Sequence, residues 1–259
     1  MHDGHSGSGL TLGDWLAQEP YTLGLSSGFF GFFAHAGFLA ALEDAELPPA
    51  ALSGSSAGAL VAGVWASGRS MTTLRSQLFT LKREDFWDPG LGFGLLKGEL
   101  FAERLHEFLG AKTFDACESP LSISTFDLQS LKTRVIKEGS LVTAIRGSCC
   151  FPGLFHPVKV DGRWSIDGGV LDRPGLAGIA DGARLLYHHL DSRSRLRKHV
   201  GPLTGVPRRE NMAVIRLQNL PRLGPNCLEM GADAYHQAYG RMSQALTMVV
   251  DPSGPGIEL

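Results

Sequence analysis

A serine in a short glycine-rich stretch is the first residue of this chain whose setting suggests chemistry. Residues 52–63 read LSGSSAGALVAG, and within them Gly54, Ser55, Ser56, Ala57 and Gly58 fit the pattern G-x-S-x-G. In this pattern small flanking residues let the backbone turn sharply and leave the serine oxygen exposed as a nucleophile. A helix that begins just after the serine would direct unpaired N–H groups at the oxyanion formed when the serine attacks a carbonyl. Ser56 is therefore a candidate nucleophile, and a glycine bend that packs two helices closely is the structural alternative.

A second glycine-rich turn offers backbone donors for the same reaction. The segment GLSSGFFGFF, residues 24–33, follows an apolar run and opens a helical pattern, as a dinucleotide-binding loop would. Its glycines do not make G-x-G-x-x-G, however, and no acidic residue ends a strand about twenty positions later. We interpret it as an oxyanion loop, in which the N–H groups of Gly28, Phe29, Phe30 and Gly31 bind the developing charge while the rings exclude water. The alternative is a tight turn whose phenylalanines belong to the core.

A histidine is the usual base for a serine nucleophile, because its pKa lies near the operating pH. The chain has nine histidines, and none stands in a persuasive setting. His35 follows the glycine loop by one helical turn and is predicted to be a core or supporting residue. His156, in FPGLFHP, is the best histidine candidate because it lies near other suggestive residues.

Asp167 is a stronger candidate for the base. It ends the second strand of the hairpin predicted over VKVDGRWSIDGG, and Gly168 and Gly169 after it allow a close approach to another turn. An aspartate, with an ordinary pKa of about 3.9, can activate a serine only if the site holds the two in contact and excludes water. The alternative is that Asp167 only caps the turn that follows it.

The elements that would position these residues alternate along the chain. An apolar strand over residues 21–27 precedes a helix that ends at Pro48, and a second strand before Ser56 precedes a helix closed by Gly68. Two such units in succession predict a parallel sheet, because a crossover helix usually joins parallel strands. Further strands are predicted at 121–128, 133–139, 183–190 and 212–217, and a helix over 228–249. Residues 71–110 are predicted to be mainly helix and loop, and residues 87–100 to form a flap.

Length and composition favour one domain over two. The 259 residues, 43% of them hydrophobic, suit one large core, so we expect a disordered tail over residues 1–9 and a single domain over 10–259. A net charge of −2 gives no global attraction to nucleic acid, and no apolar run is long enough to span a bilayer. The start lacks a secretory signal, and four cysteines, two of them adjacent, do not form a disulfide framework. We therefore expect a cytoplasmic protein.

Three separated segments together resemble the patatin-like phospholipases. They are LSSGFFGFFAHAGFL, LSGSSAGALVAGVWASG and IRGSCCFPGLFHPVKVDGRWSIDGGVLDRP, and they span most of residues 22–175 in the order typical of that family. The resemblance implies a three-layer α/β/α fold with a mostly parallel central sheet. It also implies a Ser-Asp dyad without histidine, with Ser56 as nucleophile, Asp167 as base, and residues 147–155 supporting the pair from below. The oxyanion loop departs from the common G-G-G-x-R/K-G form and looks more like the G-F-L-G form of animal triglyceride lipases.

The favoured hypothesis is a lipid acyl hydrolase that acts on a lipid or fatty-acyl ester without a cofactor, a metal or a nucleic-acid partner. A Ser-His-Asp hydrolase that uses His156 and a catalytically silent lipid-binding protein are the alternatives. The stretch 193–209 carries basic residues and no acidic one, so it is a candidate for docking on an anionic membrane surface. A solvated loop is the favoured interpretation of that stretch.

Overall fold

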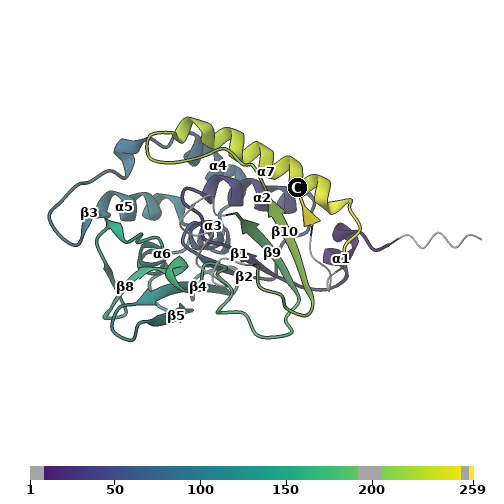
Figure 1. Cartoon of the computed structure of the whole chain (residues 1–259), viewed down its shortest axis with the longest axis horizontal. Coiled ribbons are helices and arrows are strands. Elements are labelled where there is room, and N and C mark those ends of the chain that lie inside the picture. The colour runs from purple at the N-terminus through teal and green to yellow at the C-terminus, as the bar shows by residue number, and fades with distance from the viewer. Residues whose placement is uncertain (1–8, 192–205, 252–256) are drawn as a thin grey trace, which may run out of the picture.

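The centre of the molecule is a nine-stranded sheet (Figure 1). The structure is a computed structural model that describes residues 9–191, 206–251 and 257–259. Its strand order is β11-β10-β9-β1-β2-β4-β8-β7, with β5 added to β4. The strands are β1 Thr22–Leu25, β2 Ala51–Ser55, β4 Leu121–Asp127, β5 Lys132–Ile136, β7 Val158–Val160, β8 Arg163–Asp167, β9 Leu185–Leu190, β10 Met212–Leu217 and β11 Ile257–Glu258. The pairings from β11 through β4 are parallel, and those of β5, β7 and β8 are antiparallel. The predicted α/β fold with a mostly parallel sheet is confirmed.

Seven α-helices accompany this sheet in the described part of the chain. They are α1 Leu12–Gln18, α2 Phe32–Asp44, α3 Ala57–Ala66, α4 Met71–Phe79, α5 Glu99–Phe108, α6 Leu141–Ser148 and α7 Gly231–Leu246. In Figure 1, α2 and α7 run side by side over one side of the sheet, and the two helices are in contact along their length. None of the helices in the described ranges combines the length and apolar character needed to cross a bilayer.

Strands β9 and β10 carry apolar residues on both faces, as expected for parallel strands covered on both sides. On one face Leu186 of β9 and Ile215 of β10 join the large core shared with the helices. On the other face Leu185 and Tyr187 join a smaller cluster that Leu176 covers from the connection after β8. The period-two alternation of a strand therefore divides one run of apolar residues between two cores.

Strand β4 brings distant segments together. Its residues 121–124 pair with β2, and its residues 125–127 pair with β8. Because β5 pairs with residues 123–127 along one edge of β4, both β2 and β8 must use the opposite edge. The end of β2 at Ser55 and the end of β8 at Asp167 therefore meet at neighbouring positions on β4, opposite Ser124 and Thr125. This register places two residues more than a hundred positions apart at one point.

The hairpin predicted before Asp167 is confirmed. Strands β7 and β8 are joined by Asp161 and Gly162, with φ angles of 46° and 78°. Positive φ at both central residues is what a two-residue turn needs to match the twist of the strands. Gly68, predicted to close the helix after Ser56, also has a left-handed φ of 84°.

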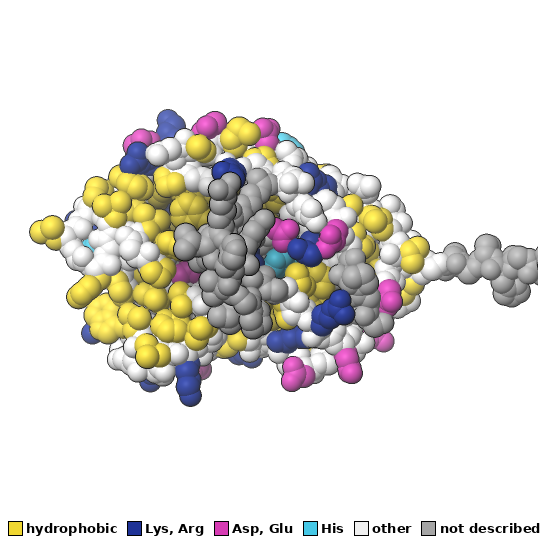
Figure 2. Space-filling view, in the orientation of Figure 1, with side chains coloured by type: hydrophobic (Ala, Val, Ile, Leu, Met, Phe, Trp, Pro, Cys, Tyr) yellow, Lys and Arg dark blue, Asp and Glu magenta, His cyan; other side chains and the backbone are white. Residues whose placement is uncertain are grey.

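The predicted flap lies at one end of the molecule. Its strand β3, Gly94–Leu96, pairs with β6, Gly153–Phe155, in a separate two-stranded sheet. Figure 2 shows hydrophobic side chains gathered on the surface at the end that carries β3 and α5. The basic stretch 193–209 lies mostly outside the described residues, as do residues 1–8 of the expected tail. At its described end, the Arg209 guanidinium donates to the carbonyl oxygens of Leu176 and Ile179.

Candidate active site

Ser56 occupies a strained turn between β2 and α3. Its φ of 53° and ψ of −119° are rarely adopted by a residue with a side chain, and such strain persists where the surrounding structure enforces it. A Cβ added at Gly54 would lie 2.5 Å from the backbone of Gly58. A Cβ added at Gly58 would lie 2.2 Å from the carbonyl oxygen of Leu25. The glycines of the G-x-S-x-G stretch therefore permit the close approach of α3 to β1 and β2.

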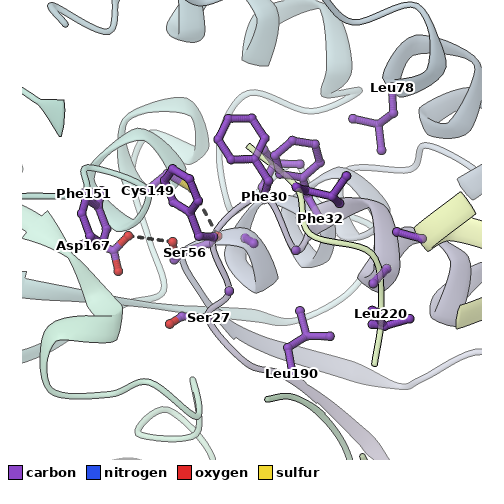
Figure 3. Close-up of a pocket in the computed structure, with 18 of the residues that line it drawn as sticks. Ser27, Phe30, Phe32, Ser56, Leu78, Cys149, Phe151, Asp167, Leu190 and Leu220 are labelled. Carbon is purple, nitrogen blue, oxygen red and sulfur yellow. Dashed lines mark hydrogen bonds between the residues drawn. The ribbon is translucent and has the colours of Figure 1, made fainter. Parts of the chain in front are cut away.

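The Ser56 hydroxyl donates a hydrogen bond to the Asp167 carboxylate (Figure 3), with 2.6 Å between Oγ and Oδ2. The other carboxylate oxygen, Oδ1, accepts the N–H of Gly169 at 2.8 Å. Asp167 therefore both contacts the serine and caps the turn after its own strand. The contact with Ser56 and the capping role, which are alternatives when judged from the sequence, occur together. The side chain is nearly buried, with 5% of Asp167 exposed. This turn fixes the direction of the carboxylate before any substrate binds.

Gly168 and Gly169 permit the close approach that their position predicts. A Cβ at Gly168 would lie 2.1 Å from the carbonyl oxygen of Ser124 in β4. A Cβ at Gly169 would lie 2.2 Å from the hydroxyl oxygen of Ser27 in the glycine loop. A side chain at Gly168 would clash with the backbone of β4, and one at Gly169 would displace the Ser27 hydroxyl.

Ser148 stabilises the serine turn. The sequence indicated the segment 147–155 that contains it but did not identify Ser148 as an individual functional residue. Its hydroxyl oxygen accepts the backbone N–H of Ser56 at 2.8 Å and donates to the carbonyl of Ser124 at 2.7 Å. Its neighbour Cys149 directs its thiol at the carbonyl of Ser56, with 3.2 Å between sulfur and oxygen. Burial raises the pKa of the Cys149 thiol well above its usual range, so it is a neutral donor. The resemblance to patatin-like proteins indicated this segment, but not these contacts.

The predicted oxyanion loop lies beside Ser56. The Gly31 N–H donates to the Gly28 carbonyl at 2.9 Å, so Gly31 closes the turn and its N–H is already used. Phe30, inside this turn, has a φ of 55°. The N–H groups of Gly28, Phe29 and Phe30 make no hydrogen bond to another residue in the described ranges. These three N–H groups, together with the first N–H groups of α3, are candidate donors to an oxyanion.

A buried histidine pair holds the start of this loop. His35 Nε2 lies 2.7 Å from the carbonyl oxygen of Ser26, and His35 Nδ1 lies 2.9 Å from Nδ1 of His188. Because a carbonyl only accepts, His35 must carry its proton on Nε2 and accept one from His188. Burial lowers the pKa of His35 to about 4, which keeps this ring neutral at neutral pH. His35 is thus the supporting core residue that the sequence predicted.

The serine and the aspartate open into a largely apolar cavity of about 580 Å³. Figure 3 shows Leu78 and Leu220 on the side of this cavity away from Asp167. The apolar lining consists mainly of Gly28, Phe29, Phe30, Phe32, Leu60, Leu78, Leu81, Phe86, Phe101, Phe108, Phe151, Leu154, Phe155, Leu190, Leu217, Leu220, Leu223 and Ala234. The size lies within the range of small-molecule sites. The volume and the mostly apolar lining suit a hydrocarbon chain with its carbonyl end at Ser56.

His156, the alternative base, lies elsewhere. Its Nε2 is 3.0 Å from the carbonyl oxygen of Gly94 in β3, and it does not line the cavity that contains Ser56. No described histidine lines that cavity. In the described part of the chain, no group of three or more potential ligand side chains is arranged to hold a metal ion. The described residues near the serine therefore offer a carboxylate, and no imidazole, as the proton acceptor.

Comparison with known proteins connects this arrangement to one family. The model of that family, described as patatin-like phospholipase, matches residues 23–178. An uncharacterised NTE family protein of Mycobacterium tuberculosis is 33% identical over 167 residues, which are 61% of this chain and 45% of that relative. The neuropathy target esterase sws of Drosophila grimshawi is 28% identical over 174 residues, 63% of this chain and 12% of the esterase. The chain thus aligns with less than half the length of these relatives.

Among solved structures, that of VipD from Legionella pneumophila superimposes with a TM-score of 0.63 at 16% identity. The match covers 88% of this chain and 67% of VipD. At this low identity, the match shows that the two proteins share a fold.

Proposed function

Because this chain belongs to the patatin-like phospholipase family, we propose that it is a lipid acyl hydrolase with Ser56 as nucleophile and Asp167 as base. The observation that carries the proposal is the 2.6 Å hydrogen bond between Ser56 Oγ and Asp167 Oδ2 at the wall of an apolar cavity. A serine hydroxyl that points at a buried carboxylate has a proton acceptor in place before the substrate arrives. The substrate class is a carboxylic ester of a fatty acid.

The proposed reaction has two steps. In the first, Ser56 Oγ attacks the ester carbonyl carbon while Asp167 takes the hydroxyl proton, and the carbonyl oxygen becomes an oxyanion near the N–H groups of Gly28, Phe29 and Phe30. The carbonyl re-forms, the ester C–O bond breaks, and the alcohol leaves with the proton from Asp167. In the second, Asp167 takes a proton from water, whose oxygen attacks the acyl-serine ester. Collapse of this second oxyanion releases the fatty acid and returns the proton to Ser56.

Two features support an aspartate as base in this setting. The bond from the Gly169 N–H leaves one carboxylate oxygen aimed at Ser56, so little reorganisation is needed when the proton moves. The rings of Phe29 and Phe151, with centroids 5.8 Å apart, place apolar surface in the lining of the cavity that contains the pair. A bound acyl chain would displace further water and strengthen the interaction between the two groups.

The test is hydrolysis of p-nitrophenyl butyrate, lysophospholipid, phospholipid and triacylglycerol by the wild type, Ser56→Ala and Asp167→Asn. We expect each variant to lower kcat by about a thousandfold or more, because removing one member of a nucleophile–base pair disables the unit. Matched controls are Ser76→Ala, an exposed serine on α4, and Asp161→Asn, an exposed aspartate in the hairpin turn. Both controls should retain wild-type turnover.

Three outcomes would contradict parts of this proposal. Full ester hydrolysis by Ser56→Ala would exclude Ser56 as the nucleophile. Loss of turnover in His156→Ala, with Asp167→Asn fully active, would favour a Ser-His-Asp mechanism. Failure of a fluorophosphonate to label Ser56 in the folded wild type would favour a silent lipid-binding protein.

A further inference from the structure

Two apolar side chains at the tip of the 89–96 loop are almost fully exposed. This loop has the sequence PGLGFGLL, which contains no charged or polar side chain. Leu91 is 103% exposed and Phe93 is 91% exposed, and Leu95 beside them is half exposed. Adjacent exposed apolar residues on one protrusion usually mark a surface that another phase or molecule covers.

The loop is held in this extended position by its own hydrogen bonds. The Gly90 N–H donates to the carbonyl of Leu95 at 3.0 Å, and His156 Nε2 lies 3.0 Å from the carbonyl oxygen of Gly94. At its base, the Asp88 carboxylate accepts the first N–H groups of α5, including that of Glu99 at 2.7 Å. The backbone therefore holds Leu91 and Phe93 away from the core. This also gives His156 a role, as an anchor of the loop.

The loop pairs with a strand that contributes to the lining of the cavity. Strand β3 within it pairs with β6, and Phe155 of β6 lines the cavity that contains Ser56. Phe29 and Phe151 also line that cavity and are 55% and 38% exposed. Figure 2 shows an apolar surface over this end of the molecule. A surface that covers the loop tip would thus lie against the end of the molecule that carries β6, whose Phe155 lines the cavity.

We propose that the 89–96 loop docks the protein on a lipid–water interface by inserting Leu91 and Phe93 among the acyl chains. The inference rests on the proposed function, because it supplies the surface from which a fatty-acyl ester would reach Ser56. The loop tip protrudes and carries no hydrogen-bonding side chain, so a protein partner would need a matching apolar hollow. The acyl region of a bilayer accommodates such a tip without a preformed hollow, and burial of both side chains drives the insertion.

The test is flotation of the full chain with phosphatidylcholine vesicles, in a Ser56→Ala background so that lipid is not consumed. We expect Leu91→Ser/Phe93→Ser to lower the vesicle partition coefficient about tenfold or more, from the transfer energies of the two side chains. The matched control is Val249→Ser, which removes a 62% exposed apolar residue that bridges to Thr11. Thr11 precedes α1, which lies at the other end of the molecule from β3 (Figure 1). This control should float like the parent protein.

A second variant tests insertion directly. In Phe93→Trp, with Ser56→Ala, we expect an added fluorescence component that shifts to shorter wavelength when vesicles are present. Unchanged partition of Leu91→Ser/Phe93→Ser, or no spectral shift in Phe93→Trp, would overturn the proposal. Loss of self-association by Leu91→Ser/Phe93→Ser without loss of vesicle binding would instead identify a second copy of the chain as the occupant, and would also overturn it.

Hydrolysis of the soluble ester p-nitrophenyl butyrate separates this inference from the proposed function. With Ser56 intact, Leu91→Ser/Phe93→Ser should keep wild-type turnover of this ester and lose turnover of vesicle lipid. Wild type that floats with vesicles but hydrolyses no ester would contradict the proposed function and leave docking supported. Wild type that hydrolyses the soluble ester but does not float would contradict docking alone.

Discussion

The geometry of Ser56 and Asp167 depends on hydrogen bonds to other residues. Ser56 has a strained conformation with a φ of 53°, and the Ser148 hydroxyl accepts its N–H; the Gly169 N–H donates to the other oxygen of Asp167 and orients that carboxylate. Strain at the serine is therefore balanced by contacts from α6 and from the turn after β8. The motif identifies the residues, and these supporting contacts determine their geometry.

Acid should destabilise the fold through the buried histidines. Burial lowers the pKa of His35 to about 4, from an ordinary value of 6.5. Above pH 6.5 this ring is neutral in both the folded and unfolded states, so its contribution to stability is complete. Between pH 6.5 and pH 4 the unfolded chain binds a proton that the folded state excludes, and the free energy of unfolding falls by about 3 kcal/mol at pH 4.

Urea unfolding at pH 7 and at pH 4.5 measures this effect in wild type and His35→Gln. The glutamine can donate to the Ser26 carbonyl but does not titrate, so we expect the variant to lose less stability on acidification. The control is His106→Gln, an exposed histidine on α5, which should show the wild-type pH dependence. Identical pH dependence in wild type and His35→Gln would show that the buried ring does not govern acid stability.

At the scale of elements, the approach of α3 to the sheet sets the position of the serine turn. A Cβ at Gly58 would lie 2.2 Å from the Leu25 carbonyl oxygen and 2.8 Å from that of Ser26, and backbone atoms cannot swing aside as a side chain can. We expect Gly58→Ala to destabilise the protein by about 1–3 kcal/mol, the usual cost of overpacking. It should also lower kcat, because α3 carries N–H groups toward Ser56.

Gly240→Ala is the matched control for that variant. Gly240 lies within α7, and an added Cβ there meets nothing within 4 Å. The same substitution should raise stability by about 0.5–1 kcal/mol, because alanine favours the helix. Urea unfolding measures the free energy of unfolding of both variants. Equal effects at the two positions would mean that helix propensity, and not the contact of α3 with β1, determines the effect of Gly58→Ala.

The elements that the sequence predicted are those with local signals. The two strand–turn–helix units and the hairpin at Asp161 and Gly162 follow from apolar spacing and turn residues, and all of them are present. The contact of Ser56 with Asp167 was expected from the resemblance to a family, because no local pattern gives the register of β2 and β8 on β4. The contacts of Ser148 and His188 could not be predicted, because they depend on which atoms these residues meet in the folded chain.

At the scale of the whole molecule, the cavity is assembled from segments that no local pattern connects. Its walls come from the glycine loop, from α4 and α5, and from residues 217–223 together with Ala234 of α7. Each segment supplies apolar residues that, in the sequence alone, look like ordinary core. The size of this cavity is therefore a property of tertiary packing.

Narrowing the far side of this cavity should change the preferred chain length without disabling the chemistry. Leu220 lines the cavity on the side away from Asp167 (Figure 3) and lies outside any helix or strand, so a larger side chain there need not distort the sheet. We expect Leu220→Trp to retain turnover of p-nitrophenyl butyrate and to lower kcat/KM for p-nitrophenyl palmitate about tenfold or more. Leu220→Met, which nearly conserves volume, should keep the wild-type ratio between the two esters. If Leu220→Trp also keeps that ratio, the acyl chain does not extend past Leu220, and the cavity accepts the chain by another route.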